Sequence, residues 1–136
     1  MLVSDLQNGV VLFNAGRFFD AHEVLEDVWR EAPRQSPLRR HLQGMVQLAV
    51  AFHHQSKGNQ VGARSVLERA MRNISGADSS FPNLDLDRLR ADLACWREHL
   101  DNCLGAAEKC LEVRDVRRHD VCNSKAPALP KIRKRR

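Results

Sequence analysis

No apolar stretch in this sequence is long enough to cross a bilayer. The uninterrupted runs, such as Leu48–Phe52, fall far short of the roughly 20 residues that a transmembrane helix needs. The first residues, MLVSDLQNGVV, lack the basic start of a secretory signal and carry Asp5. We therefore expect a cytoplasmic protein with no membrane partner.

Motifs of several enzyme classes are also missing. The sequence contains no G-x-G-x-x-G or G-x-x-x-x-G-K-[ST] phosphate loop and no G-x-S-x-G elbow, which excludes nucleotide-binding folds and elbow hydrolases. No C-x-x-C pair occurs among the four cysteines, Cys95, Cys103, Cys110 and Cys122. Without zinc or redox spacing, we expect these cysteines to be reduced thiols. Three histidines have polar neighbours and are expected at the surface: His41, His99 and His119.

The charge is distributed unevenly along the chain. The 136 residues carry a net charge of +5. Residues 114–136 hold nine basic and two acidic residues, or +7, which leaves −2 for residues 1–113. Because apolar periodicity ends near residue 113, we expect a helical domain over 1–113 and a largely disordered basic tail over 114–136. Nucleic acid could be contacted only through 117–136, and the alternative is a solvated basic terminus.

The apolar spacing of three and four residues predicts only helices. Ser36 followed by Pro37 is a helix start signal, and Gly58 followed by Asn59 is a stop signal. The expected helices cover residues 4–14, 18–32, 37–57, 60–74 and 85–113. The sequence therefore predicts an all-α protein, a compact bundle of about five helices.

The last of these helices carries a regular apolar seam. Its positions alternate at three and four residues: Leu86, Leu89, Leu93, Trp96, Leu100, Cys103, Ala107 and Cys110. Such a seam fits a coiled-coil homodimer through residues 86–110, or one long helix lying across its own core. Both alternatives stay open at this stage.

Chemistry-bearing residues gather on the second and third expected helices. The second helix carries the motif H-E-x-x-E-x-x-W, formed by His22, Glu23, Glu26 and Trp29. His22 and Glu26 are one turn apart, whereas Glu23 projects to the exposed side. On the third helix a polar stripe interrupts an apolar surface and consists of Gln43, Gln47 and His54. His53 projects to another side of that helix.

These residues predict a polar pocket between two antiparallel helices. It would be built from His22, Glu26, Gln43, Gln47 and His54, roofed by Trp29, and would bind a divalent metal or a small polar ligand. His22, Glu26 and His54 would be the metal ligands, with Zn²⁺, Mn²⁺ or Fe²⁺ as the ion. The alternative is a structural hydrogen-bond network in a non-enzymatic interaction domain. Catalysis, if present, would be metal-dependent hydrolysis.

Three sequence blocks resemble a known family. They are FNAGRFFDAHEVLEDVWRE, the Q-G-x-x-Q block and the H-H-x-x-x-G-N block, and together they resemble the prokaryotic family called domain of unknown function 309 over about residues 8–75. The resemblance implies a compact, cytosolic all-α fold of about five helices and no particular activity. The matching positions are His22, Glu23, Glu26, Trp29, Gln43, Gln47, His54, Gly58 and Asn59. The fifth helix and the basic tail lie outside it.

Overall fold

The part of the chain that the structure describes folds into five α-helices. The structure, a computed structural model, describes residues 2–113 and 126–135, with side chains described over 4–105 and 126–135. The elements are α1 (Leu2–Asn14), α2 (Phe18–Glu31), α3 (Pro37–Ser56), α4 (Gln60–Asn73), a short 3-10 helix η1 (Ala77–Ser79) and α5 (Leu86–Val113). The predicted all-α class is confirmed. None of the described helices is long and apolar enough to span a membrane.

Local signals set the helix boundaries where the sequence predicts them. The hydroxyl of Ser36 accepts a hydrogen bond from the backbone N–H of Arg39, and Pro37 occupies the first turn of α3. Gly58 follows α3 with φ of 77°, a left-handed conformation that costs glycine little. Asn59 then caps α4 by accepting a hydrogen bond from Gly62 N. The expected bounds agree with the structure to within one or two residues.

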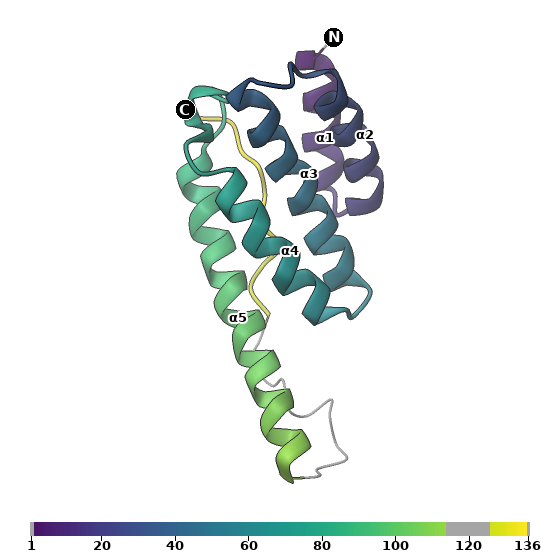
Figure 1. Cartoon of the computed structure of the whole chain (residues 1–136), viewed down its shortest axis with the longest axis vertical. Coiled ribbons are helices and arrows are strands. Elements are labelled where there is room, and N and C mark those ends of the chain that lie inside the picture. Colours follow the sequence, from purple (N-terminus) through teal and green to yellow (C-terminus); the bar gives the residue numbers. More distant parts are fainter. Residues whose placement is uncertain (1, 114–125, 136) are drawn as a thin grey trace.

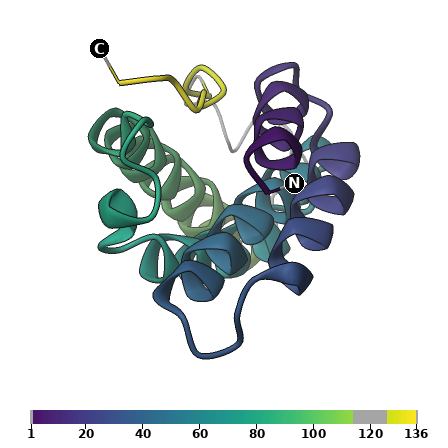
Figure 2. The ribbon, with the colours of Figure 1, turned by 90° about the horizontal axis from the view of Figure 1, so that it is seen from above.

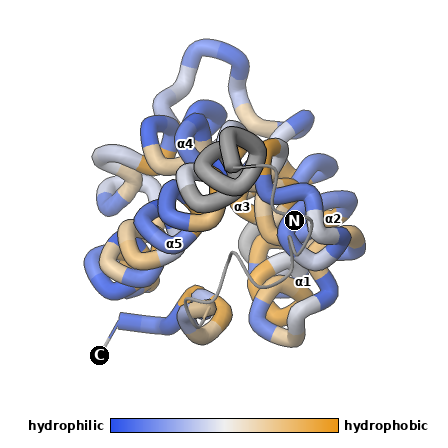
Figure 3. The backbone as a smooth tube through the Cα atoms, turned by 90° about the horizontal axis from the view of Figure 1, so that it is seen from below, coloured by the Kyte–Doolittle hydropathy of each residue, from blue (hydrophilic) through white to orange (hydrophobic). Residues whose placement is uncertain are grey.

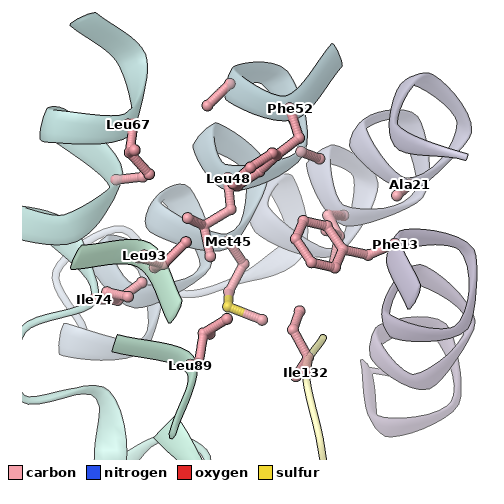
Figure 4. Close-up of a cluster of buried hydrophobic side chains, with 14 of the residues drawn as sticks. Phe13, Ala21, Met45, Leu48, Phe52, Leu67, Ile74, Leu89, Leu93 and Ile132 are labelled. Atoms are coloured by element: carbon pink, nitrogen blue, oxygen red, sulfur yellow. The ribbon is translucent and has the colours of Figure 1, made fainter. Parts of the chain in front are cut away.

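The helices pack around α3 (Figure 1). It lies between α2 and α4, and α5 packs against α4 on the far side. Gly44 allows α3 and α4 to approach closely, because a Cβ there would lie 2.6 Å from a methyl group of Ile74. Side chains from every helix meet in one core, in which Met45 and Leu48 of α3 face Phe13 and Leu93 (Figure 4).

The apolar seam of α5 lies in the core of its own chain. The described seam positions from Leu86 to Cys103 are at most 2% exposed. These positions fit the second alternative, one long helix lying across its own core, and the homodimer through the 86–110 seam stays a prediction. The side chains of Ala107 and Cys110 lie outside the described residues. Beyond the bundle, α5 extends past the ends of the other helices (Figure 1).

The end of the chain differs from the expected disordered tail. Residues 126–135, here called the C-terminal segment, run in an extended conformation between α1 and α5 (Figures 2 and 3). Ile132 is only 3% exposed, and Pro130 is fully buried. Residues 114–125 lie outside the described part of the chain. The expectation of disorder does not hold for the C-terminal segment, because Pro130 and Ile132, which are two residues apart, enter the core.

Two histidines and one cysteine also differ from expectation. His41 and His99 are buried rather than at the surface, and His119 is not among the described residues. His41 Nδ1 lies 2.6 Å from the hydroxyl of Ser80, and the ring of His99 packs edge-on against Trp96. Cys103 is disulfide-bonded, whereas Cys95 is free and exposed. The expectation that all cysteines are reduced is therefore wrong for Cys103.

Candidate functional site

The α2 motif residues pair with one another along their own helix. His22 Nε2 lies 3.1 Å from one carboxylate oxygen of Glu26, and Arg30 donates to the other oxygen at 2.9 Å. The spacing of four residues places these three groups on successive turns. His22 and Glu26 are partly exposed, whereas Glu23 is exposed as expected. Both oxygens of Glu26 therefore have partners within α2.

The histidine of α3 that lies beside α2 is His53 rather than His54. The His53 ring centroid is 5.4 Å from that of Phe19, which in turn is 6.1 Å from that of His22. Helical spacing puts His53 on the same side of α3 as Leu42 and Ala49, which are buried in the core. The ring contact with Phe19 therefore places His53 beside α2.

The polar stripe of α3 contacts α4 and the loop that joins α3 to α4. Gln47 Oε1 accepts a hydrogen bond of 2.7 Å from Asn73 Nδ2 on α4, and His54 Nδ1 lies 3.3 Å from Asn59 Nδ2. Gln43 is exposed. The stripe is present on the helix, but its hydrogen-bond partners are Asn73 and Asn59 rather than the His22–Glu26 pair.

The residue expected to roof the pocket has another role. The guanidinium of Arg39 lies 4.3 Å from the centre of the Trp29 ring, a cation–π arrangement. Arg39 also donates to the carbonyls of Trp29 and Ala32, at 3.3 and 3.0 Å, where α2 ends. The Trp29 indole N–H is buried and has no partner among the described residues. Trp29 and Arg39 therefore fasten the start of α3 to the end of α2.

The predicted pocket residues thus form separate pairs. Within the described residues, no group of three or more His, Cys, Asp or Glu side chains could hold a metal ion. The set of His22, Glu26 and His54 stays a prediction without geometric support. The arrangement favours the structural network that the sequence left as the alternative.

A second set of polar contacts holds the C-terminal segment. The side-chain oxygen of Asn14 accepts a hydrogen bond from the backbone N–H of Ile132 at 2.8 Å. The side-chain NH₂ group of Asn14 donates a hydrogen bond to the backbone C=O of Ile132 at 2.9 Å. The indole N–H of Trp96 donates to the carbonyl of Ala128 at 3.0 Å. Near the start of α5, Asp85 N donates to Arg133 O and Arg135 N donates to Asn83 O, at 2.8 and 2.7 Å. These contacts come from α1, α5 and the residues before α5, and we call this set the α1–α5 surface.

Side chains of the C-terminal segment divide into buried and exposed residues. Pro130 and Ile132 are buried, whereas Leu129 and Lys131 are exposed. The Ile132 side chain points toward Phe13, Met45 and Leu89 (Figure 4). The segment is therefore bound as an extended chain, by main-chain hydrogen bonds and buried side chains two residues apart.

An acidic side chain, Asp78, lies near the basic end of the C-terminal segment. Arg135 lies 3.8 Å from Asp78, which also pairs with Arg90 at 2.9 Å. The hydrogen bond from Arg90 and the nearby positive charges lower the pKa of Asp78, so its carboxylate stays ionised. Lys131 and Lys134 are exposed. The predicted contact of residues 117–136 with nucleic acid stays a prediction, and residues 117–125 are not described.

Sequence patterns gave little indication of the α1–α5 surface. Asn14 was expected only as a helix end, and Trp96 only as a seam position. The available signal was the apolar and proline content of ALPKI within a basic stretch, which favours an extended, partly buried segment. Its binding surface could not be predicted, because Asn14 and Ile132 are 118 residues apart.

Fold and contacts define a small all-α bundle with one extended segment bound to it. The model of the family described as "Domain of unknown function (DUF309)" matches residues 6–66, so the predicted resemblance is confirmed over that range. It includes the α2–α3 motif and Asn14, and it excludes α5 and the C-terminal segment.

Two bacterial proteins show similarity over most of the chain. The uncharacterized protein YpuF of Bacillus subtilis (strain 168) is 28% identical over 116 residues, which cover 83% of this chain and 66% of that protein. An uncharacterized protein of Aquifex aeolicus (strain VF5) is 26% identical over 103 residues, covering 76% of this chain and 28% of the relative. The chain thus corresponds to about two thirds of one relative and just over a quarter of the other.

Proposed function

We propose that this chain is a non-enzymatic helical interaction domain that binds extended peptide segments on its α1–α5 surface. The observation that carries the proposal is the bound C-terminal segment, in which both main-chain groups of Ile132 are hydrogen-bonded to Asn14. Peptides bound as extended chains obtain affinity from main-chain hydrogen bonds and specificity from alternate side chains. The contacts of residues 126–135 have both features.

The energetics also favour a binding surface. Burying a side chain such as Ile132, which is 3% exposed, contributes about 1.5–3 kcal/mol. Each main-chain hydrogen bond adds about 0.5–1.5 kcal/mol. These contacts act against the entropy that a free peptide loses on association, and a titration measures the net affinity.

The polar residues of α2 and α3 fit this proposal better than a ligand pocket. Glu26 is engaged by His22 and Arg30, and Gln47 is engaged by Asn73. The Gln47–Asn73 bond joins α3 to α4, whereas the contacts of Glu26 lie along α2. Neither set leaves a group of metal ligands together among the described residues. In this proposal the α2–α3 motif stabilises the bundle that presents the α1–α5 surface.

Binding of a labelled peptide tests the proposal. The probe is a fluorescent peptide with the sequence of residues 126–136, titrated with a full-length chain carrying Ile132→Asp, which frees the α1–α5 surface. We expect saturable binding by fluorescence anisotropy, and none with a peptide in which the isoleucine is also aspartate. If the folded Ile132→Asp chain binds neither peptide, the proposed function is wrong.

A further inference from the structure

We infer that the peptide partner of the α1–α5 surface has the pattern Pro-x-Ile followed by cationic residues, and that residues 126–135 compete with it within the same chain. This inference rests on the proposed function and specifies its ligand and its regulation. It is argued from the register, charge and covalent connection of the C-terminal segment.

The register of the segment is fixed by two buried positions that are two residues apart. Pro130 has no N–H and therefore needs no acceptor in its buried place. Ile132 places its side chain in the core while Asn14 binds its N–H and C=O. A shift by one residue would place Lys131 in the core and remove the isoleucine. A ligand in trans therefore needs proline and isoleucine two residues apart.

The preference for cationic residues follows from the loop before α5. The backbone of Arg133 and Arg135 is paired with Asp85 and Asn83, which brings the Arg135 side chain within 3.8 Å of Asp78. Residues 1–113 carry a net charge of −2. Cationic residues after the isoleucine therefore increase the affinity of a peptide by electrostatic attraction. Salt weakens this attraction because the charged groups are exposed.

Covalent connection gives the chain's own segment an advantage over a free peptide. Only the residues 114–125 separate α5 from the C-terminal segment. A tethered ligand of this kind has an effective concentration on the order of millimolar. A free peptide with the same contacts therefore binds the wild-type chain only by displacing residues 126–135. Weakening the segment's own contacts should raise the measured affinity for a peptide in trans.

The experiment compares three full-length chains: wild type, Ile132→Asp and Leu129→Asp. Leu129 is 49% exposed in the same segment, so Leu129→Asp introduces the same charge without removing a buried anchor. The probe is the labelled peptide with the sequence of residues 126–136. We expect Ile132→Asp to bind the probe at least about tenfold more tightly than wild type, and Leu129→Asp to bind it as wild type does.

Two further peptides test the pattern itself. Moving the isoleucine by one position should abolish binding to Ile132→Asp. Replacing the residues that correspond to Arg133, Lys134 and Arg135 with glutamine should weaken binding and reduce its salt dependence. Full affinity for the shifted peptide would disprove the fixed register, and unchanged affinity for the neutral peptide would disprove the charge preference.

The outcomes separate this inference from the proposed function. Equal affinity of wild type and Ile132→Asp would overturn the competition within the chain, while the binding surface would stand. If neither the wild type nor Ile132→Asp binds the labelled peptide, the proposed binding function is wrong. Circular dichroism checks that Ile132→Asp is folded; should it unfold, the milder Ile132→Ala takes its place, with the same order of affinities expected.

Discussion

Asn14, the last residue of α1, binds both main-chain groups of Ile132, at 2.8 Å and 2.9 Å, across 118 residues of sequence. A side-chain amide has one donor group and one acceptor, which match one peptide N–H and one C=O. This pair joins the start of the chain to its end, next to the main hydrophobic core.

The Asn14→Ala substitution should therefore destabilise the protein. It leaves the N–H and C=O of Ile132 without their partner in a partly buried place, at a cost of about 1–3 kcal/mol. Asn8 is exposed on the same helix, and Asn8→Ala should change stability by no more than about 0.5 kcal/mol. Urea unfolding followed by circular dichroism measures both. Equal stability of the two variants would contradict the role of Asn14.

Acid should destabilise the fold through His41. Burial, and then the charge of Arg40, lower the pKa of His41 below 6.5, against the opposing effects of the Ser75 backbone and Asp78. Arg40 Nη2 lies 3.4 Å from Nε2 of this histidine, and a guanidinium can only donate, so the ring is neutral with its proton on Nδ1 toward Ser80. Protonation of His41 at Nε2 would place an N–H donor opposite the Arg40 guanidinium, which is also a donor and carries a positive charge.

The sign of the pH dependence follows from this lowered pKa. Below pH 6.5 the unfolded chain binds a proton at His41 that the folded chain does not, so the stability present above 6.5 is lost as pH falls through this window. Unfolding free energies measured from about pH 7.5 down to about pH 5 should decrease. His41→Asn, which keeps a donor for Ser80, should show a smaller decrease. An unchanged slope would show that another group causes it.

Substitution on the α5 seam should unfold the chain rather than dissociate a dimer. Leu93 is fully buried in the core, and an aspartate there should cost about 4 kcal/mol or more. The exposed Ala94 provides the control, because Ala94→Asp introduces the same charge at a solvent-facing position of α5. Circular dichroism and light scattering distinguish the outcomes. If the wild type is a dimer and Leu93→Asp is a folded monomer, the seam is a dimer interface.

Metal content tests the remaining ligand hypothesis. Because Glu26 is paired with His22 and Arg30, we expect protein purified without an affinity tag to hold no stoichiometric Zn²⁺, Mn²⁺ or Fe²⁺. The double variant His22→Ala, His54→Ala should give the same result by elemental analysis. Stoichiometric metal in the wild type that this variant loses would contradict the structural role of the pair and support the predicted metal site.

The difference between His53 and His54 marks the limit of the sequence prediction for the candidate site. Spacing along α3 correctly separated a polar stripe from the side that contains His53. It could not say which side of α3 would lie beside α2, because this depends on how the whole bundle packs. The histidine assigned to another side is therefore the one beside Phe19, and Gln47 interacts with α4.

Local physics by itself determined the helices of this protein. Caps such as Ser36, left-handed glycines such as Gly58 and apolar spacing act within a few residues, and each can be recognised in the sequence. Tertiary structure alone decided that the α5 seam is core and that His41 is buried. It also decided that Ile132 lies on Asn14. Each of these depends on contacts between residues distant in sequence, whose energies no local pattern records.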